Sequence, residues 1–275
     1  YLKCHHCDWQ AYIPTVCPDC GSQNLDAKGI GTTRLSENLH AIFANPQTSK
    51  ELYPIIQIDR DTTRGKDSWE NIYQRINEGK PAILVGTQMV AKGHDIENVT
   101  AVGILAADSS LNLPDFRSAE RTFALVMQAA GRAGRGSKAG QVVVQTYHPG
   151  HYAMIAGAAQ DYQRFYQQEI RFRQELRYPP FAQFLKLTFS GGDESRTMKT
   201  AEDTAALLQD RLESTGSPID VLGPYAAPVA KIGDLFRVQL LLRGENLTAA
   251  KQTLIECGIA GSAAITIDVD PLGMM

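Results

Sequence analysis

The sequence has few cysteines, no excess of basic charge and no long hydrophobic run. Five cysteines in 275 residues are too few for a disulfide-dense secreted scaffold. No apolar run approaches the roughly 20 residues that cross a bilayer, and no secretory signal is present. The net charge of −3 excludes a broadly basic nucleic-acid-binding protein but remains compatible with a local basic groove. We therefore expect a soluble, cytoplasmic protein without membrane contact.

The phosphate-binding sequence Gly-x-x-x-x-Gly-Lys-Ser/Thr is also missing, as are internal repeats and low-complexity tracts. The chain begins at Tyr1 rather than at methionine, three residues before a cysteine motif, which favours a segment of a longer protein. Because 43% of the residues are hydrophobic, a chain of this length can build two packed domains.

Four of the five cysteines form two Cys-x-x-Cys pairs, Cys4 with Cys7 and Cys17 with Cys20. Such a pair brings two thiolates to one tetrahedral zinc ion from a tight turn, and four thiolates close a structural site. The alternative is reduced or disulfide-bonded cysteines without metal, but the paired spacing favours zinc. By spacing alone, all four cysteines bind one ion. The fifth, Cys257, lies in an apolar helical pattern and is expected to be a small core residue.

From about residue 29, apolar strands alternate with helices. Strands are expected at 55–59, 82–85, 99–107 and 141–146, and helices at 35–44, 68–77 and 118–130. Nearly continuous apolar strands in such an alternation are typical of a parallel sheet covered by helices on both faces. The fold class expected for this region is therefore α/β.

The last third of the chain shows a different pattern. A single long helix is expected over 153–177, and the Pro179-Pro180 pair after it marks the best domain boundary. Beyond it, the sequence predicts a strand at 184–189, a helix at 196–214, two strands within 219–242, a helix at 247–257 and a strand at 264–269. This β-α-β-β-α-β order suggests a ferredoxin-like α+β domain. The expected domains are therefore 1–28, 29–178 and 179–275.

The segment 83–95, ILVGTQMVAKGHD, is the first candidate site in the α/β region. The buried strand ends at Gly86, so the polar residues that follow lie where open α/β sheets bind ligands, beyond the carboxyl ends of the strands. Thr87 offers a hydroxyl group and an N–H group to a phosphate, Gly93 permits close backbone approach, and Asp95 can accept from a ribose hydroxyl or orient water. An ordinary strand followed by a turn is the alternative.

The segment 128–136, QAAGRAGRG, is the second candidate site. Arg132 and Arg135 lie among glycines at the end of a helix, so their guanidinium groups have little steric cover. Two such groups suit the γ-phosphate of ATP, where an arginine finger offsets charge that develops in the transition state. Gln128, one turn earlier, is placed to hold water or phosphate. A basic loop at a helix C-terminus is the simpler alternative.

These residues carry a resemblance. The GTQM and AKGHD sequences resemble motif V of superfamily-two helicases, and 128–135 resembles motif VI. With the cysteine pairs directly before Gly-Ile-Gly-Thr32, essentially the whole chain resembles the C-terminal part of the bacterial primosomal replication-restart helicases. The resemblance implies a RecA-like second helicase lobe between a zinc-binding module and the ferredoxin-like domain.

The resemblance also implies roles for the site residues. Thr87, Gln88 and Met89 would contact DNA, with Gly93 and Asp95 near the nucleotide. The motif VI residues Arg132 and Arg135 would complete the site for ATP with Mg²⁺, beside Gln128. The phosphate-binding loop belongs to the other lobe in this family, so this chain would hold half of an ATP site and be inactive alone.

For the cysteines, the resemblance points away from the single ion that spacing suggests. The family has four cysteine pairs that bind two zinc ions, and its pairs interleave. Cys4 with Cys7 and Cys17 with Cys20 would then serve different ions, each with upstream partners.

The implied function is a 3′-to-5′ DNA helicase that acts at stalled replication forks. Its implied partners are single-stranded and branched DNA, replication-restart proteins and single-stranded-DNA-binding protein. Two alternatives stay open: a non-enzymatic fork-binding scaffold that loads replication partners, and a different superfamily-two enzyme with a zinc ribbon.

Overall fold

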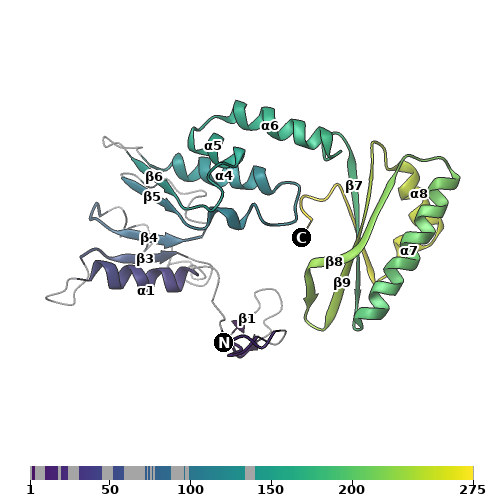
Figure 1. Cartoon of the computed structure of the whole chain (residues 1–275), viewed down its shortest axis with the longest axis horizontal. Helices are drawn as coiled ribbons and strands as arrows, with labels where there is room; N and C mark the ends of the chain where they lie inside the picture. Colours follow the sequence, from purple (N-terminus) through teal and green to yellow (C-terminus); the bar gives the residue numbers. More distant parts are fainter. Residues whose placement is uncertain are drawn as a thin grey trace. The chain divides into compact units, whose positions relative to one another are not determined.

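The structure of the chain is a computed structural model that describes residues 2–3, 10–17, 20–23, 31–44, 52–58, 72, 74, 76, 78–87, 96, 99–133 and 140–274 (Figure 1). The chain divides into two compact units. One comprises Asp26–Leu113 with Ser118–Gln168, and the other comprises Tyr1–Leu25, Pro114–Arg117 and Glu169–Met275.

The unit of residues 26–113 and 118–168 contains two pairs of parallel strands. Strand β3 (Ile55–Ile58) pairs with β4 (Ile83–Gly86), and β5 (Ala101–Ile104) pairs with β6 (Gln141–Val144). The predicted strands and their parallel pairing are thus confirmed. Within the described residues each pair forms its own two-stranded ladder. The third strand ends earlier than the predicted residue 107, because the 3₁₀ helix η1 (Ala107–Ser109) follows it.

Helices cover these strands. Helix α1 (Thr32–Phe43) packs on β3, where the Ser36 hydroxyl donates to the Gln57 side-chain oxygen and the Gln57 amide donates to Thr32, both at 3.3 Å. Helix α4 (Ser118–Ala130) has the bounds that its apolar spacing predicts and contacts β5 and β6. The predicted helix at 68–77 lies largely outside the described residues.

The prediction of a single helix over 153–177 is wrong. The structure has two helices, α5 (Tyr152–Ala158) and α6 (Tyr162–Glu175). Between them Gln160 takes a left-handed φ of 54°, and the Asp161 N–H donates to the Ala156 carbonyl, which ends α5. The Asp161 carboxylate then accepts from the Arg164 N–H at 2.9 Å and caps α6. The helical spacing of apolar residues continues across this break. The sequence pattern therefore could not reveal that α5 and α6 are separate helices.

The second unit contains the predicted β-α-β-β-α-β order. Its elements are β7 (Gln183–Gly191), α7 (Glu194–Ser214), β8 (Asp220–Ile232), β9 (Leu235–Gly244), α8 (Thr248–Glu256) and β10 (Ile265–Val269). The strands form one sheet in the order β10-β7-β9-β8, with every neighbouring pair antiparallel. Each helix therefore connects strands that have another strand between them, as the expected ferredoxin-like arrangement requires.

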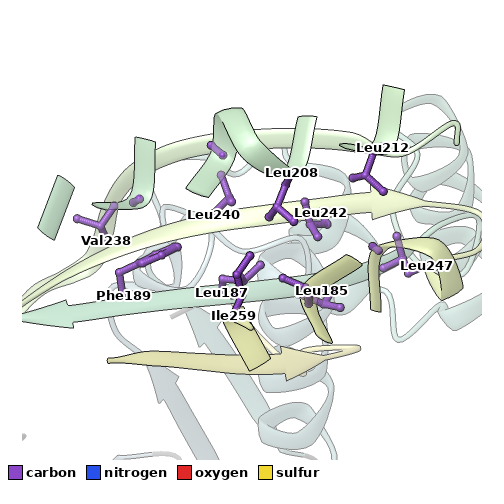
Figure 2. Close-up of a cluster of buried hydrophobic side chains, with 14 residues drawn as sticks. Leu185, Leu187, Phe189, Leu208, Leu212, Val238, Leu240, Leu242, Leu247 and Ile259 are labelled. Carbon is purple, nitrogen blue, oxygen red and sulfur yellow. The ribbon is translucent and has the colours of Figure 1, made fainter. Parts of the chain in front are cut away.

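The core of this unit lies between one face of the sheet and the two helices (Figure 2). Alternate residues of β7 and β9 point into it because side chains on a strand alternate between the faces. These strand residues are Leu185, Leu187, Phe189, Val238, Leu240 and Leu242, each at most 2% exposed. Leu208 and Leu212 of α7 and Leu254 of α8 close the core from the other side. Cys257 packs against this cluster, as its sequence context predicts.

The N-terminal residues that the structure describes form a short antiparallel ladder. Strand β1 (Leu2–Lys3) pairs with β2 (Gln10–Ala11) on either side of the first cysteine pair. Among the described residues, no helix has the length and the apolar character needed to span a bilayer.

Candidate functional site

Thr87 lies immediately beyond the carboxyl end of β4, where the strand–turn pattern places it. Thr87 is exposed, and the preceding Gly86 is the last residue of the strand. Because β3 and β4 run parallel, both strands end at the same edge of the ladder. Gln88, Met89, Gly93 and Asp95 lie outside the described residues, so the structure does not bear on their predicted roles.

Gln128 and Arg132 lie at the C-terminal end of α4. The helix buries Phe123, Val126 and Ala129, which leaves Gln128 exposed. After Ala130 the backbone tightens, and the Arg132 N–H donates to the Ala129 carbonyl at 3.1 Å. Arg132 is partly buried in this turn. Arg135 lies outside the described residues.

The core beneath α4 holds its C-terminal turn in place. Val126 and Ala129 pack with Ile104 of β5 and Met154 of α5 in one cluster of buried side chains. At the other end of α4 the Ser118 hydroxyl donates to the Leu113 carbonyl at 2.7 Å. The position of Arg132 relative to β5 is therefore set by the packing of α4 against β5 and α5.

A buried carboxylate, which sequence reasoning missed, organises the carboxyl ends of β5 and β6. Asp108 is 4% exposed. It accepts from the Thr146 hydroxyl at 2.5 Å, the Tyr147 N–H at 2.8 Å and the His148 N–H at 3.3 Å. Burial alone would raise the pKa of Asp108, but these hydrogen bonds outweigh it and hold the pKa below its ordinary value.

The signal for Asp108 was present in the sequence as an acidic residue directly after an apolar strand. Extending that strand to residue 107 concealed it. The backbone completes the connection, because the Gln145 N–H donates to the Ile104 carbonyl and the Ala107 N–H donates to the Gln145 carbonyl. Asp108 thus braces the sheet edge where parallel α/β sheets bind ligands.

The second cysteine pair occupies a tight turn. The Gly21 N–H donates to the Cys17 carbonyl at 3.0 Å, and the Cys17 N–H donates to the Ser22 carbonyl at 2.8 Å. Gly21 has a φ of +69°, which lets the chain reverse directly after Cys20. A reversal of this kind suits two thiolates that share one metal ion. Cys4 and Cys7 lie outside the described residues, and the described ones contain no complete metal cluster.

Comparison with known proteins identifies both halves of the chain. Residues 28–137 match the helicase conserved C-terminal domain, and residues 174–272 match the primosomal protein N C-terminal domain. Replication restart protein PriA of Bacillus subtilis is 41% identical over 247 residues, which cover 90% of this chain and 29% of that protein. The chain belongs to the PriA family.

Other PriA proteins match over nearly the whole chain. The Synechocystis protein is 37% identical, with 99% of this chain and 32% of the relative covered. The Treponema pallidum protein is 36% identical, with 100% of this chain and 41% of the relative covered. The chain spans about a third of the length of these curated relatives. The expected family and a RecA-like helicase lobe are therefore confirmed.

Proposed function

We propose that this chain supplies the second motor lobe of an ATP-dependent DNA helicase that acts in replication restart and unwinds in the 3′-to-5′ direction. The match of residues 28–137 to the helicase C-terminal domain carries the proposal. The position of Thr87 directly beyond the carboxyl end of β4 supports it, because open α/β sheets bind ligands at that edge.

The nucleotide-binding residues act on phosphates that the other lobe holds together with Mg²⁺. Arg132 and Arg135 offset the charge that develops on the γ-phosphoryl group, and Gln128 orients water or phosphate beside them. Gly93 and Asp95 lie next to the nucleotide. Because this chain lacks a phosphate-binding loop, it does not hydrolyse ATP by itself.

Thr87, Gln88 and Met89 contact the DNA strand. They follow β4 directly, so a movement of the lobe as a rigid body carries them along the strand. Closure of Arg132 and Arg135 onto the nucleotide thereby couples ATP turnover to translocation.

The cysteines contribute a structural zinc-binding module. Cys4 with Cys7 and Cys17 with Cys20 each hold one side of a different zinc ion, in the interleaved arrangement implied by the family. The tight turn at Cys17–Cys20 supports this role for the second pair. Zinc supplies cross-links to a segment with almost no apolar core.

The direct test is unwinding by the intact protein. With ATP and Mg²⁺, it should separate a forked duplex with a 3′ single-stranded tail, while this chain alone should show no turnover. Unwinding from a 5′ tail only would contradict the proposed polarity, and ATP hydrolysis by this chain alone would contradict the two-lobe site.

The separate match of residues 174–272 favours a second role, because this region forms its own packed sheet and helices. In this alternative the protein is a scaffold that binds branched DNA, replication-restart proteins and single-stranded-DNA-binding protein without needing its motor. An intact protein that lacks ATPase activity but still recruits these partners to a fork would support the scaffold.

A further inference from the structure

The sheet of the C-terminal unit has a second face, opposite the one that packs on α7 and α8. Phe184 and Leu241 point to this face, where they pack with Met274. Two hydrogen bonds hold the segment that carries Met274. The Met274 N–H donates to the Asp115 carboxylate at 3.1 Å, and the Lys186 ammonium group donates to the Gly273 carbonyl at 2.8 Å. The segment that carries Met274 thus covers part of the second face.

Beside this cover lies a cavity of about 230 Å³. It is lined by Pro114, Tyr225, Ala226, Pro228, Gln239 and Met274. Sites for drug-sized ligands usually have volumes of about 300–1,000 Å³. The cavity therefore has room for a single small ring system.

Gln239 is the exceptional residue of this cavity. It is 0% exposed, and neither its amide nitrogen Nε2 nor its amide oxygen Oε1 has a hydrogen-bond partner in the structure. Buried polar groups in proteins almost always have partners, and an unsatisfied one destabilises the fold. The unpartnered amide of a residue that lines this cavity therefore points to a ligand that supplies a donor and an acceptor.

Tyr225 is held beside Gln239 by the local backbone. The two residues are directly opposite in the β8–β9 ladder, next to a bulge between Leu222 and Tyr225. Gly223 in this bulge has a φ of +105°, and a Cβ atom there would lie 2.9 Å from the Tyr225 ring and 3.1 Å from the Gln239 carbonyl. The glycine thus permits the close approach of the tyrosine ring to β9. Burial raises the pKa of Tyr225 above its ordinary value.

We propose that this cavity takes one unstacked nucleobase of single-stranded DNA, with adenine preferred. The glutamine amide offers the donor and acceptor that pair with N7 and N6 of adenine. Tyr225 and the two prolines supply the aromatic and apolar surfaces against which a flat base packs. A peptide group offers the same two hydrogen bonds, but the ring-rich walls favour a planar ring. The inference rests on the proposed DNA-binding function and adds a base-reading contact to it.

The experiment uses the 275-residue chain with ¹³C-labelled methionine methyl groups, and Met274→Leu assigns the Met274 signal. The chain is titrated at low salt with dA and dT octanucleotides. We expect the Met274 signal to shift with the dA octamer and much less with the dT octamer. Gln239→Leu should reduce affinity for the dA octamer roughly 5- to 100-fold and remove the preference for it. Gln209→Leu, an exposed change on α7, should leave both affinities unaltered.

The outcomes separate this inference from the proposed function. Binding of both octamers with an unmoved Met274 signal would overturn the cavity proposal and leave DNA binding intact. No binding of either octamer would overturn the cavity proposal, whereas unwinding by the intact protein tests the proposed function separately. A Met274 shift with N-methylacetamide but not with the dA octamer would assign the cavity to a peptide group instead. If Gln239→Leu does not fold, Tyr225→Leu provides the same comparison because it removes the ring surface.

Discussion

The Thr146 hydroxyl donates a hydrogen bond of 2.5 Å to the Asp108 carboxylate, which lies 38 residues earlier in the chain. This contact connects the segment after β5 with the segment after β6. Two backbone N–H groups, of Tyr147 and His148, donate to the same carboxylate. The carboxyl ends of the two parallel strands are therefore tied together through one buried charged group.

Asp108→Asn should destabilise the chain at pH 7, because an amide cannot accept all three hydrogen bonds that the carboxylate accepts. The pKa of Asp108 is lower in the folded state than in the unfolded state. The Asp108 carboxylate therefore stabilises the fold fully when the pH is above the unfolded-state pKa of about 3.9. This contribution is lost as the pH falls through the folded-state pKa. Denaturant unfolding at several pH values measures the free energies of unfolding of the wild type and the variant. The stability gap between wild type and variant should narrow below about pH 4; a gap independent of pH would contradict the assignment.

Arg132→Ala or Arg135→Ala should abolish the DNA-stimulated ATPase activity of the intact protein, with little change in DNA affinity. Arginine fingers typically contribute about 10³-fold or more to turnover. A coupled ATPase assay and fluorescence anisotropy with single-stranded DNA measure the two quantities. Arg171→Ala, an exposed change on α6, is the matched control and should retain turnover. Normal turnover in both site variants would exclude the finger role.

Replacement of both Cys17 and Cys20 by serine should lower the zinc content of the intact protein, because serine does not supply a thiolate ligand. Elemental analysis measures the content, and Cys257→Ser should leave it unchanged because Cys257 packs against the C-terminal core. Zinc content unaffected by the double substitution would remove these cysteines from the site.

An anomalous zinc map of the intact protein should show two peaks, with Cys4 and Cys7 at one and Cys17 and Cys20 at the other. Interleaved pairs cross-link the segment more extensively than a single site does, which favours them where an apolar core is nearly absent. One peak bound by all four cysteines would show that the spacing of the pairs, rather than the family arrangement, determines the site.

Gly157→Ala should destabilise the chain by about 1 kcal/mol, although alanine is the better helix former. A Cβ atom at Gly157 in α5 would lie 3.0 Å from Cβ and Cγ1 of Val126, which is 1% exposed in α4. Gly150→Ala is the control because nothing lies within 4 Å of a Cβ atom there. Chemical denaturation should show a change within about 0.5 kcal/mol for the control. If the Gly157→Ala variant and the wild type have equal free energies of unfolding, α4 and α5 move apart without cost.

Local patterns in the sequence were sufficient to predict most elements. The apolar spacing of 118–130 predicted α4, whose C-terminal end carries Arg132, and the alternating pattern after Pro180 predicted the β-α-β-β-α-β order. The motif residues predicted the helicase family that comparison with known proteins then confirmed. These features depend on periodicity and on neighbouring residue types, both of which a single sequence displays.

Contacts between distant residues were decided only by the tertiary structure. The environment of Asp108 depends on residues almost 40 positions away, since Thr146 supplies one of its hydrogen bonds. Gln239 is 0% exposed, and it lines one cavity with Met274, which lies 35 positions later in the chain. Sequence periodicity thus determined which face each side chain takes, whereas the packing of remote segments determined whether that face meets water.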